Sequence, residues 1–449
     1  MIGFAYTALC AWPLVAIFLF SKMTPSKAAV RAFVLGWLFL PCLAIPLPGL
    51  PDYTKASAAS LGVLLGAILF DPAALRSLRF RPIDLPMLAW CLVPFLSSMT
   101  NDLGPYDGAS GVVSNVITYG LPYLIGRVYL TTPEGLEDLA REIVIGGLLY
   151  IPFCLYELKM SPMLHGQIYG FMASSFLHVV RYGGYRPMVF MQSGLELGMW
   201  MAAACLIGIW MWRSGVREIA GRPFGPLLSA LIVTTILCKS TGALMLLLAG
   251  LVAIWVAAKY RNFAIVLALV AIPTVYMALR STGLWSGENV VAMINSTLGE
   301  DRGESIEFRF KNENVLAAKA MEQPWFGWGG WGRARVADED GKDTTITDGL
   351  WIITLGDRGF VGLAVLTAIY TLPVLRLRKR YPPALWGSLQ MAPAAVLAIL
   401  LTLYMIDNLS NAMFSPVYLL AVGGLMGLDC DPWELDPDDL EDVDEMALE

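Results

Sequence analysis

Long apolar runs alternate with shorter polar connections along almost the whole chain. A membrane-spanning helix needs about 20 predominantly apolar residues, and most of these runs approach that length. The pattern therefore predicts an all-α fold, a polytopic helical integral membrane protein with about 12–13 transmembrane helices and one large extracytoplasmic loop containing short helices. The predicted spans are 2–20, 29–49, 55–71, 83–99, 110–126, 138–156, 191–212, 225–239, 241–258, 262–279, 349–374, 388–407 and 411–428.

Composition supports this class. The chain has 449 residues, of which 57% are hydrophobic and 15% charged, and its mean hydropathy is +0.61. Soluble domains carry about a quarter charged residues. The net charge of −6 is unevenly distributed, because residues 429–449 hold eleven acidic residues and no Lys or Arg, while the rest of the chain is net positive. We expect this segment to be an acidic disordered tail.

Lysine and arginine are concentrated in alternate short connections, after the first, third, fifth, seventh, ninth and eleventh spans. The positive-inside rule places these connections in the cytoplasm, so the N-terminus is predicted outside and the C-terminus inside. Two longer polar segments then face outward. The predicted parts are transmembrane helices 1–279 with the outward loop 157–190, the extracytoplasmic loop 280–347, C-terminal transmembrane helices 348–428 and the cytoplasmic tail 429–449.

The first outward segment contains Arg181 and Arg186 on either side of a Gly183–Gly184 pair. Adjacent glycines permit a tight turn, which would aim both guanidinium groups at one target. Two interpretations are open. The arginines bind an anionic substrate, or they bind lipid headgroups at the membrane surface.

Two further charged residues lie close to this segment. Glu196 lies just inside the next span, where a carboxylate is costly and needs a cavity or a partner, and Arg186 is the expected partner. A structural ion pair and a substrate role are both open for Glu196. Lys239 lies at the outer turn between two spans, where snorkelling and ligand contact account for it equally well.

The second outward segment is the most cationic part of the chain. Residues 305–321 predict a helix, and Arg309 and Glu313 are four residues apart, a spacing that favours an ion pair on one face. Arg333 and Arg335 follow further along the same segment. Guanidinium groups at this density suit a multiply charged anion, and near a membrane phosphates and diphosphates are the expected anions.

Between these arginines lies a stretch rich in tryptophan and glycine, residues 323–332. Pro324 is expected to end the helix, and the glycines favour close backbone approach to a ligand. Three of them match G-x-G-x-x-G, but no strand precedes them and no helix follows, so we reject a dinucleotide site. The tryptophans Trp325, Trp328 and Trp331 either stack on sugar rings or anchor the loop at the interface.

Asp348 leads directly into the eleventh span. It is expected either to cap that helix or to act catalytically on the outer side, and the two roles are compatible. Asp357 and Arg358 interrupt the apolar stretch that follows. A broken helix and an internal ion pair are both open there.

Several of these residues match the pattern of a known family. The chain resembles the O-antigen polymerase and O-antigen ligase family of bacterial envelope enzymes, through the Arg-x-x-x-x-Arg-Pro turn at 181–187, Arg309 with the following stretch 319–329, and Asp348 followed by 355–362. The resemblance implies a metal-independent glycosyltransferase that uses lipid-diphosphate-linked sugars. In the ligases a histidine commonly stands near the position of Asp348. This chain has only His165 and His178, which favours a polymerase-like member.

The expected function is polymerisation of polyprenyl-diphosphate-linked glycan repeat units on the outer face of the bacterial inner membrane. Asp348 or Glu196 is expected to accept the proton of the acceptor hydroxyl. The expected partners are the lipid-linked donor, the glycan acceptor and membrane lipids, with a chain-length regulator or export proteins as further candidates and no nucleic acid. We expect no cofactor and no metal site, since the seven cysteines lack ligand spacing. A ligase and a non-enzymatic flippase are the alternatives. The residues expected to bind the diphosphate are Arg181, Arg186, Arg309, Arg333, Arg335 and Lys239.

Overall fold

The computed structural model describes residues 2–429 except 175–178, 182, 299, 331, 339 and 341–342. In these ranges the protein is almost entirely helical, with three small two-stranded hairpins. Eight of the described helices are long and apolar enough to cross a membrane, and three shorter helices are also apolar. The predicted all-α, polytopic membrane fold is thereby confirmed. The eight are Ile2–Lys22, Pro82–Thr100, Pro133–Met160, Gly194–Arg213, Thr241–Lys259, Ala264–Ser281, Leu350–Arg380 and Ala392–Ser410.

The hydrophobic pattern located the helices well. The eight long segments are α1 (Ile2–Lys22), η1–α5 (Pro82–Asp84 and Leu85–Thr100), α8 (Pro133–Met160), α10 (Gly194–Arg213), α12 (Thr241–Lys259), α13 (Ala264–Ser281), α16 (Leu350–Arg380) and α17 (Ala392–Ser410). The shorter elements among them are α2 (Pro25–Phe39), α3 (Lys55–Phe70), α4 (Pro72–Ser77), α6 (Pro105–Asn115), η2 (Val116–Gly120), α7 (Leu121–Tyr129), α11 (Phe224–Leu237), η4 (Pro383–Gly387) and α18 (Pro416–Gly427).

One predicted span is too long. The second was expected to run to residue 49, but α2 ends at Phe39, and the chain then forms the hairpin β1 (Ile45–Leu47) and β2 (Leu50–Tyr53). Prolines at positions 41, 46 and 48 explain the difference, because proline cannot donate the backbone hydrogen bond that a continuing helix requires. The apolar residues of this stretch therefore cover the end of the bundle instead of crossing it.

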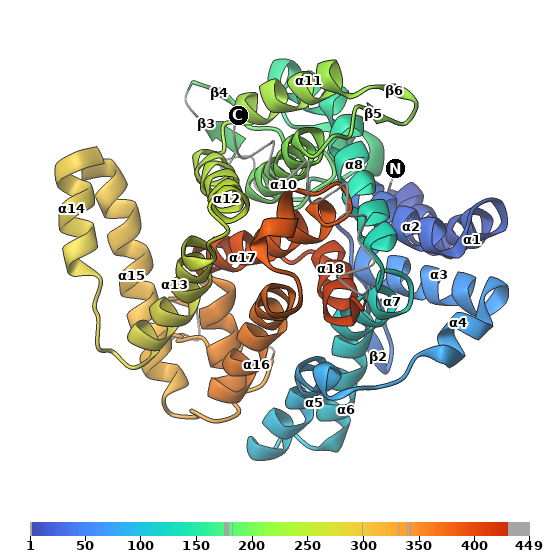
Figure 1. Ribbon diagram of the computed structural model, residues 1–449. Coiled ribbons are helices and arrows are strands. Elements are labelled where there is room, and N and C mark those ends of the chain that lie inside the picture. The colour runs from blue at the N-terminus through green and yellow to red at the C-terminus, as the bar shows by residue number, and fades with distance from the viewer. Residues whose placement is uncertain are drawn as a thin grey trace.

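Helices α10, α17 and α18 form the centre of the bundle, and α1, α5, α6 and α11 surround them (Figure 1). Close packing in the centre depends on small residues. A Cβ added to Gly423 of α18 would lie 2.1 Å from the Tyr123 carbonyl oxygen, and one added to Gly126 of α7 would lie 2.3 Å from the Leu420 carbonyl oxygen. Such backbone approach is the usual way in which membrane helices associate without a hydrophobic driving force.

The connections between helices fall on two ends of the bundle. At one end, which we call the basic end, Asp429 pairs with both Arg81 and Arg380, and the Ser26 hydroxyl donates to the Tyr129 carbonyl oxygen. The positive-inside rule predicts that the basic end is cytoplasmic. We call the opposite end the insert end. It carries the connections 40–54, 101–104, 161–193, 238–240, 282–349 and 411–415.

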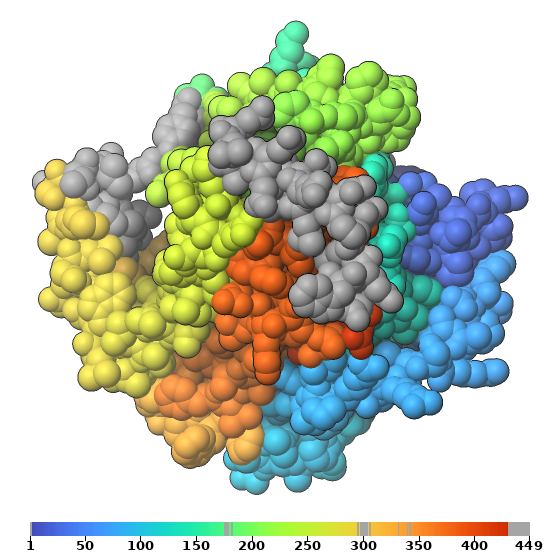
Figure 2. Space-filling model, in the orientation of Figure 1, coloured from blue at the N-terminus to red at the C-terminus, as the bar shows by residue number. Residues whose placement is uncertain are grey.

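The two long polar segments lie at the insert end. The first contains the six-residue helix α9 (Leu164–Tyr169) and the hairpin β3 (Val180–Arg181) and β4 (Gly184–Tyr185). The second contains α14 (Glu288–Leu298) and α15 (Glu300–Ala320), which stand at the edge of the bundle (Figures 1 and 2). The predicted helix at 305–321 is confirmed as the C-terminal part of α15. The remaining hairpin, β5 (Glu218–Ile219) and β6 (Arg222–Pro223), lies in the connection between α10 and α11, at the basic end.

Candidate functional site

Arg309 of α15 and Asp348, just before α16, meet at the insert end. Arg309 Nε lies 3.4 Å from Asp348 Oδ2, and Arg309 Nη1 donates to the Ser410 carbonyl oxygen at 3.2 Å. The two charged side chains are 36% and 40% exposed. A basic group and an acidic group that sequence analysis chose separately thus form one open pair, over the C-terminal end of α17.

Two expectations for these residues are wrong: Asp348 does not cap α16, and Arg309 does not pair with Glu313. Gly349 is the N-cap of α16 and no side chain caps that helix, so Asp348 lies one residue too early to act as a cap. Glu313 pairs with Arg280, with Nη2 and Oε2 3.0 Å apart, and leaves Arg309 to Asp348. Burial raises the pKa of the Glu313 carboxyl, against the lowering effect of hydrogen bonds from Tyr276 and Arg280.

Arg333 and Arg335 are used mainly within their own loop. Arg333 Nη1 donates to the Gly330 carbonyl oxygen at 3.0 Å, and Arg335 Nη1 lies 2.7 Å from Asp343 Oδ2. The backbone N–H of Thr345, and then Arg335, lower the pKa of the Asp343 carboxyl. These contacts favour a role for Arg335 in holding the loop.

Arg186 of the first polar segment and Lys239 of the α11–α12 connection lie near the N-terminal ends of α10 and α12. Arg186 is buried and its Nη2 donates to the Ser240 hydroxyl at 3.2 Å. Lys239 Nζ lies so close to the β3–β4 turn that a Cβ added to Gly184 would be 2.3 Å from it. The predicted tight turn is present, with Gly183 at φ +66°. The side chain of Arg181, as well as His178, lies outside the described residues.

Glu196 has a partner that sequence analysis did not consider. Lys55 Nζ, at the start of α3, lies 4.0 Å from Glu196 Oε1 and 3.9 Å from the centre of the Trp37 ring. The Gln192 backbone N–H donates to Glu196 Oε2 at 2.9 Å. The expected partner was Arg186, so the ion pair with Lys55 corrects that prediction. Only the fold brings the distant start of α3 to this position.

The connection between α17 and α18, residues 411–415, links the two groups of charges. On one side of it, Arg309 contacts the Ser410 carbonyl oxygen and the Leu350 N–H donates to the Asn411 carbonyl oxygen at 3.1 Å. On the other side, the Ser193 hydroxyl contacts Met413 Sδ at 3.4 Å, directly before the helix that carries Glu196. The two polar segments therefore approach one short stretch of chain.

The glycine-rich loop, residues 323–329, inserts into a break in α16. At Gly359 the backbone leaves the helical region, with φ +63° and ψ −163°. The loop replaces the interrupted hydrogen bonds. The N–H groups of Trp328 and Gly329 donate to the carbonyl oxygens of Gly356 and Asp357. In return, Phe360 and Val361 donate to the carbonyl oxygens of Pro324 and Trp325. We call this loop the strap.

The strap explains the glycines that were expected to approach a ligand. A Cβ added to Gly327 would lie 2.4 Å from the Arg358 backbone nitrogen, so the close approach is to α16. Of the tryptophans, Trp325 is 68% exposed, and Trp328 donates from Nε1 to the Lys319 carbonyl oxygen. Trp331 lies outside the described residues. A broken membrane helix is tolerated only where its backbone groups find other partners, which the strap supplies.

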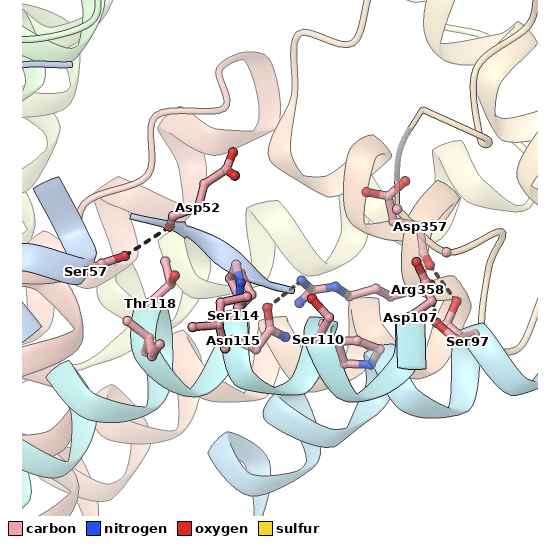
Figure 3. A pocket seen from close by; sticks show the side chains of 18 of the residues that line it. Asp52, Ser57, Ser97, Asp107, Ser110, Ser114, Asn115, Thr118, Asp357 and Arg358 are labelled. Atoms are coloured by element: carbon pink, nitrogen blue, oxygen red, sulfur yellow. Dashed lines mark hydrogen bonds between the residues drawn. The ribbon is translucent and has the colours of Figure 1, made fainter. Parts of the chain in front are cut away.

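The break also shapes a polar cavity of about 370 Å³ (Figure 3). Arg358 reaches across it, where its Nη2 donates to Asn115 Oδ1 at 2.9 Å and its guanidinium stacks on Trp90. The helix was thus broken as one interpretation allowed, and Arg358 uses Asn115 as its hydrogen-bond acceptor. The remaining polar lining comes from the β1–β2 hairpin, α3, α5, α6 and η2, and includes Asp52, Ser57, Ser97, Asp107, Ser110, Ser114 and Thr118.

The fold and these sites define a polytopic helical membrane protein with a polar, cation-rich insert end. No protein-family model matches the chain, and no curated protein matches it either. Among the described residues, no three or more His, Cys, Asp or Glu side chains are grouped to hold a metal ion. The resemblance to the O-antigen polymerase and ligase family therefore stays a prediction from the residues quoted above.

Proposed function

We propose that this protein is a glycosyltransferase that polymerises polyprenyl-diphosphate-linked glycan units at the insert end of the bundle. The observation that carries the proposal is the open pair between Arg309 and Asp348. A guanidinium and a carboxylate, both partly exposed, stand together at the junction of the insert with the membrane helices. Such a pair offers an anion-binding group and a proton acceptor in one place.

In the proposed reaction the donor diphosphate takes the place of Asp348 beside Arg309. The released carboxylate accepts the proton of the acceptor hydroxyl. The acceptor oxygen forms the new glycosidic bond to the anomeric carbon, while the bond from that carbon to the diphosphate oxygen breaks. The lipid diphosphate leaves with the electron pair, and guanidinium contacts stabilise its charge. Arg186 and Lys239 are the candidates for a second contact with it, across residues 411–415.

The ligase alternative depends on a histidine near Asp348. His165 is already engaged, because its Nε2 accepts the Cys42 N–H at 3.1 Å and its Nδ1 contacts the Phe171 carbonyl oxygen at 2.8 Å. This engagement, together with the aspartate at position 348, favours the polymerase over the ligase. The flippase alternative would place its charged site on a broken helix, and the break of α16 at Gly359 is the observation in its favour.

The test is reconstitution of the full-length protein with a defined polyprenyl-diphosphate-linked oligosaccharide in liposomes. Longer lipid-linked chains are the expected product. Transfer only to an acceptor other than the polyprenyl-diphosphate-linked glycan would identify a ligase, and movement of the oligosaccharide across the bilayer without a new bond would identify a transporter. Either result would overturn the polymerase proposal. The bacterial inner membrane and a chain-length regulator as partner belong to the same proposal.

A further inference from the structure

We propose that the polar cavity beside the break of α16 binds an uncharged sugar, and that it holds the acceptor glycan during transfer. The identification as acceptor rests on the proposed function, but the binding of a neutral sugar does not. The cavity, of about 370 Å³, falls in the lower part of the roughly 300–1,000 Å³ range of small-molecule sites. Segments from four separate parts of the chain build it.

One face of the cavity is a row of hydroxyl groups. Ser110, Ser114 and Thr118 follow one another at intervals of four residues along α6 and η2, so they lie on the same side of this continuous helical segment (Figure 3). Ser97 and Ser98 of α5 add two more. Polar residues on a membrane helix are expensive and commonly mark a substrate path. Here they explain why the span predicted at 110–126 is so weakly apolar.

The helix itself is irregular at this place. Residues 116–120 form a π-helix, a feature that often occurs at functional sites. Asn115 precedes it, is buried, and is held from both sides: its Nδ2 donates to the Trp90 carbonyl oxygen and its Oδ1 accepts from Arg358. Arg358 Nη1 is buried with no hydrogen-bond acceptor among the described residues, and Arg358 lines the cavity. Arg358 thus brings to the wall of the cavity a guanidinium that has one N–H group unpaired among the described residues.

The charges of the lining favour an uncharged ligand. Asp52 and Asp357 lie on opposite sides of the cavity, and Asp107 accepts the Ser98 hydroxyl at 2.7 Å (Figure 3). Among the described lining residues, Arg358 is the one cation, and it is engaged with Asn115 and Trp90. Three carboxylates would repel a phosphate or a uronate, whereas carboxylates and hydroxyls together accept and donate the hydrogen bonds that a sugar needs.

The cavity shares the lining residue Asp357 with a second cavity of about 90 Å³. Arg335 and Thr347, the residue before Asp348, also line this second cavity. A sugar in the larger cavity would therefore lie along the break of α16, with its neighbouring unit directed toward Asp348. In this arrangement the diphosphate binds beside Arg309, and the acceptor sugar binds in the cavity that the three aspartates line.

The experiment uses the full-length protein in lipid nanodiscs and saturation-transfer NMR with methyl glucoside, methyl galactoside and methyl mannoside, beside glucuronate. No lipid-linked donor is present. We expect saturable binding of at least one neutral glycoside and weaker binding of glucuronate. Ser114→Ala should weaken the neutral glycoside by about two- to tenfold, as expected for one lost hydrogen bond. Ser114→Phe should abolish saturable binding. Val113→Phe, at the adjacent exposed position of α6, is the matched control and should bind as the wild type does.

Absence of saturable binding to every neutral glycoside, tighter binding of glucuronate, or equal binding by Ser114→Ala and the wild type would each overturn the inference. Reconstitution separates it from the proposed function. If the glycoside binds to the wild type and not to Ser114→Phe, but no polymer forms from lipid-linked donor, the proposed function fails and the sugar site stands. If polymer forms at an unchanged rate in folded Ser114→Phe, the acceptor site fails and the polymerase stands.

Discussion

Two ion pairs on neighbouring turns of α15 differ in how completely they are enclosed. Arg280 and Glu313 are 1% and 11% exposed, and Arg280 also donates to the carbonyl oxygens of Trp285, Ser286 and Phe310. Arg309 and Asp348 are 36% and 40% exposed and share a single longer contact. Two arginine–carboxylate pairs whose α15 members lie one turn apart are therefore different: one is closed and holds α15 on α13, and the other is open to a ligand.

Whether an arginine in a polar insert is available to a substrate depends on how far its side chain is buried and paired. A buried pair whose hydrogen-bonding capacity is used by the protein has little left for a substrate, and breaking it leaves an uncompensated charge. An exposed pair contributes little to stability. The density of arginine along the sequence drew attention to the insert correctly, but only the surroundings of each side chain separate the two uses.

Arg280→Met should have the largest effect, on stability. The substitution leaves Glu313 buried without its cation, which typically costs about 3–5 kcal/mol. We expect a large fall in the melting temperature of the detergent-solubilised protein and a low yield of monodisperse material. Lys311→Ala is the matched control, since Lys311 is exposed and pairs only along its own helix with Glu307. A melting temperature equal to that of the control would contradict the closed pair.

Arg309→Ala should affect activity and leave stability almost unchanged. Loss of one electrostatic contact to the leaving group typically costs about 10²–10³ in rate, whereas an exposed pair stabilises the fold by less than about 1 kcal/mol. Arg309→Lys should also lose activity, because lysine cannot contact two oxygens as a planar guanidinium does. The readout is polymer formed by reconstituted protein at equal protein level. Wild-type rates in both variants would remove Arg309 from the site.

Gly359→Ala should have an intermediate effect on stability, and it tests whether the strap holds the break in α16. The backbone conformation at this residue is accessible almost only to glycine, and an added Cβ would lie 2.4 Å from the Trp325 carbonyl carbon. Strain of this kind costs about 1–3 kcal/mol. Hydrogen exchange should show faster exchange at the Trp328 and Phe360 amides. Gly330→Ala is the control, because no atom lies within 4 Å of the added Cβ. Unchanged exchange in Gly359→Ala would argue against the strap.

The smallest expected effect concerns the first polar segment and pH. Burial lowers the pKa of His165, whose Nε2 must accept from the Cys42 N–H and so is unprotonated in the folded protein. The unfolded chain takes up the proton first as pH falls. Stability is therefore fully present above the unfolded pKa of about 6.5 and is lost as pH falls through the lower folded pKa.

Melting temperatures between about pH 7.5 and about pH 5 should reveal this dependence, and His165→Gln should flatten it. The difference between the wild type and His165→Gln reports on His165 alone, because both proteins contain the same carboxylates. A dependence of equal size in both proteins would assign the effect to other residues.

Much of the fold was predictable because the bilayer imposes a simple requirement on sequence. Every backbone group inside it must be hydrogen-bonded, so apolar runs become helices, and all thirteen predicted spans have a helical counterpart. The exceptions have local causes. The prolines after Phe39 end α2 early, and the span at 110–126 is weakly apolar because several of its polar residues line a cavity.

The candidate site was predictable only in part. Arg309 and Asp348 could be chosen because charged residues are rare and stand at the ends of apolar runs. Lys55, Asn115 and Arg358 could not be matched to their partners, since each partner lies in a distant part of the chain. Glu313 shows the limit most clearly. Its spacing along the helix favours an ion pair with Arg309. The fold instead places the buried Arg280 beside it, and Arg280 also donates to three backbone carbonyl oxygens.

The sequence by itself determined the class of protein, the order of its helices and the two polar segments, because hydrophobic length and charge act locally along the chain. The tertiary structure decided which pairs are closed, where α16 breaks, and that glycines suited to a ligand serve the strap instead. Those outcomes depend on which backbone and side-chain groups compete for the same partner in space. Such competition is settled only when distant segments pack together.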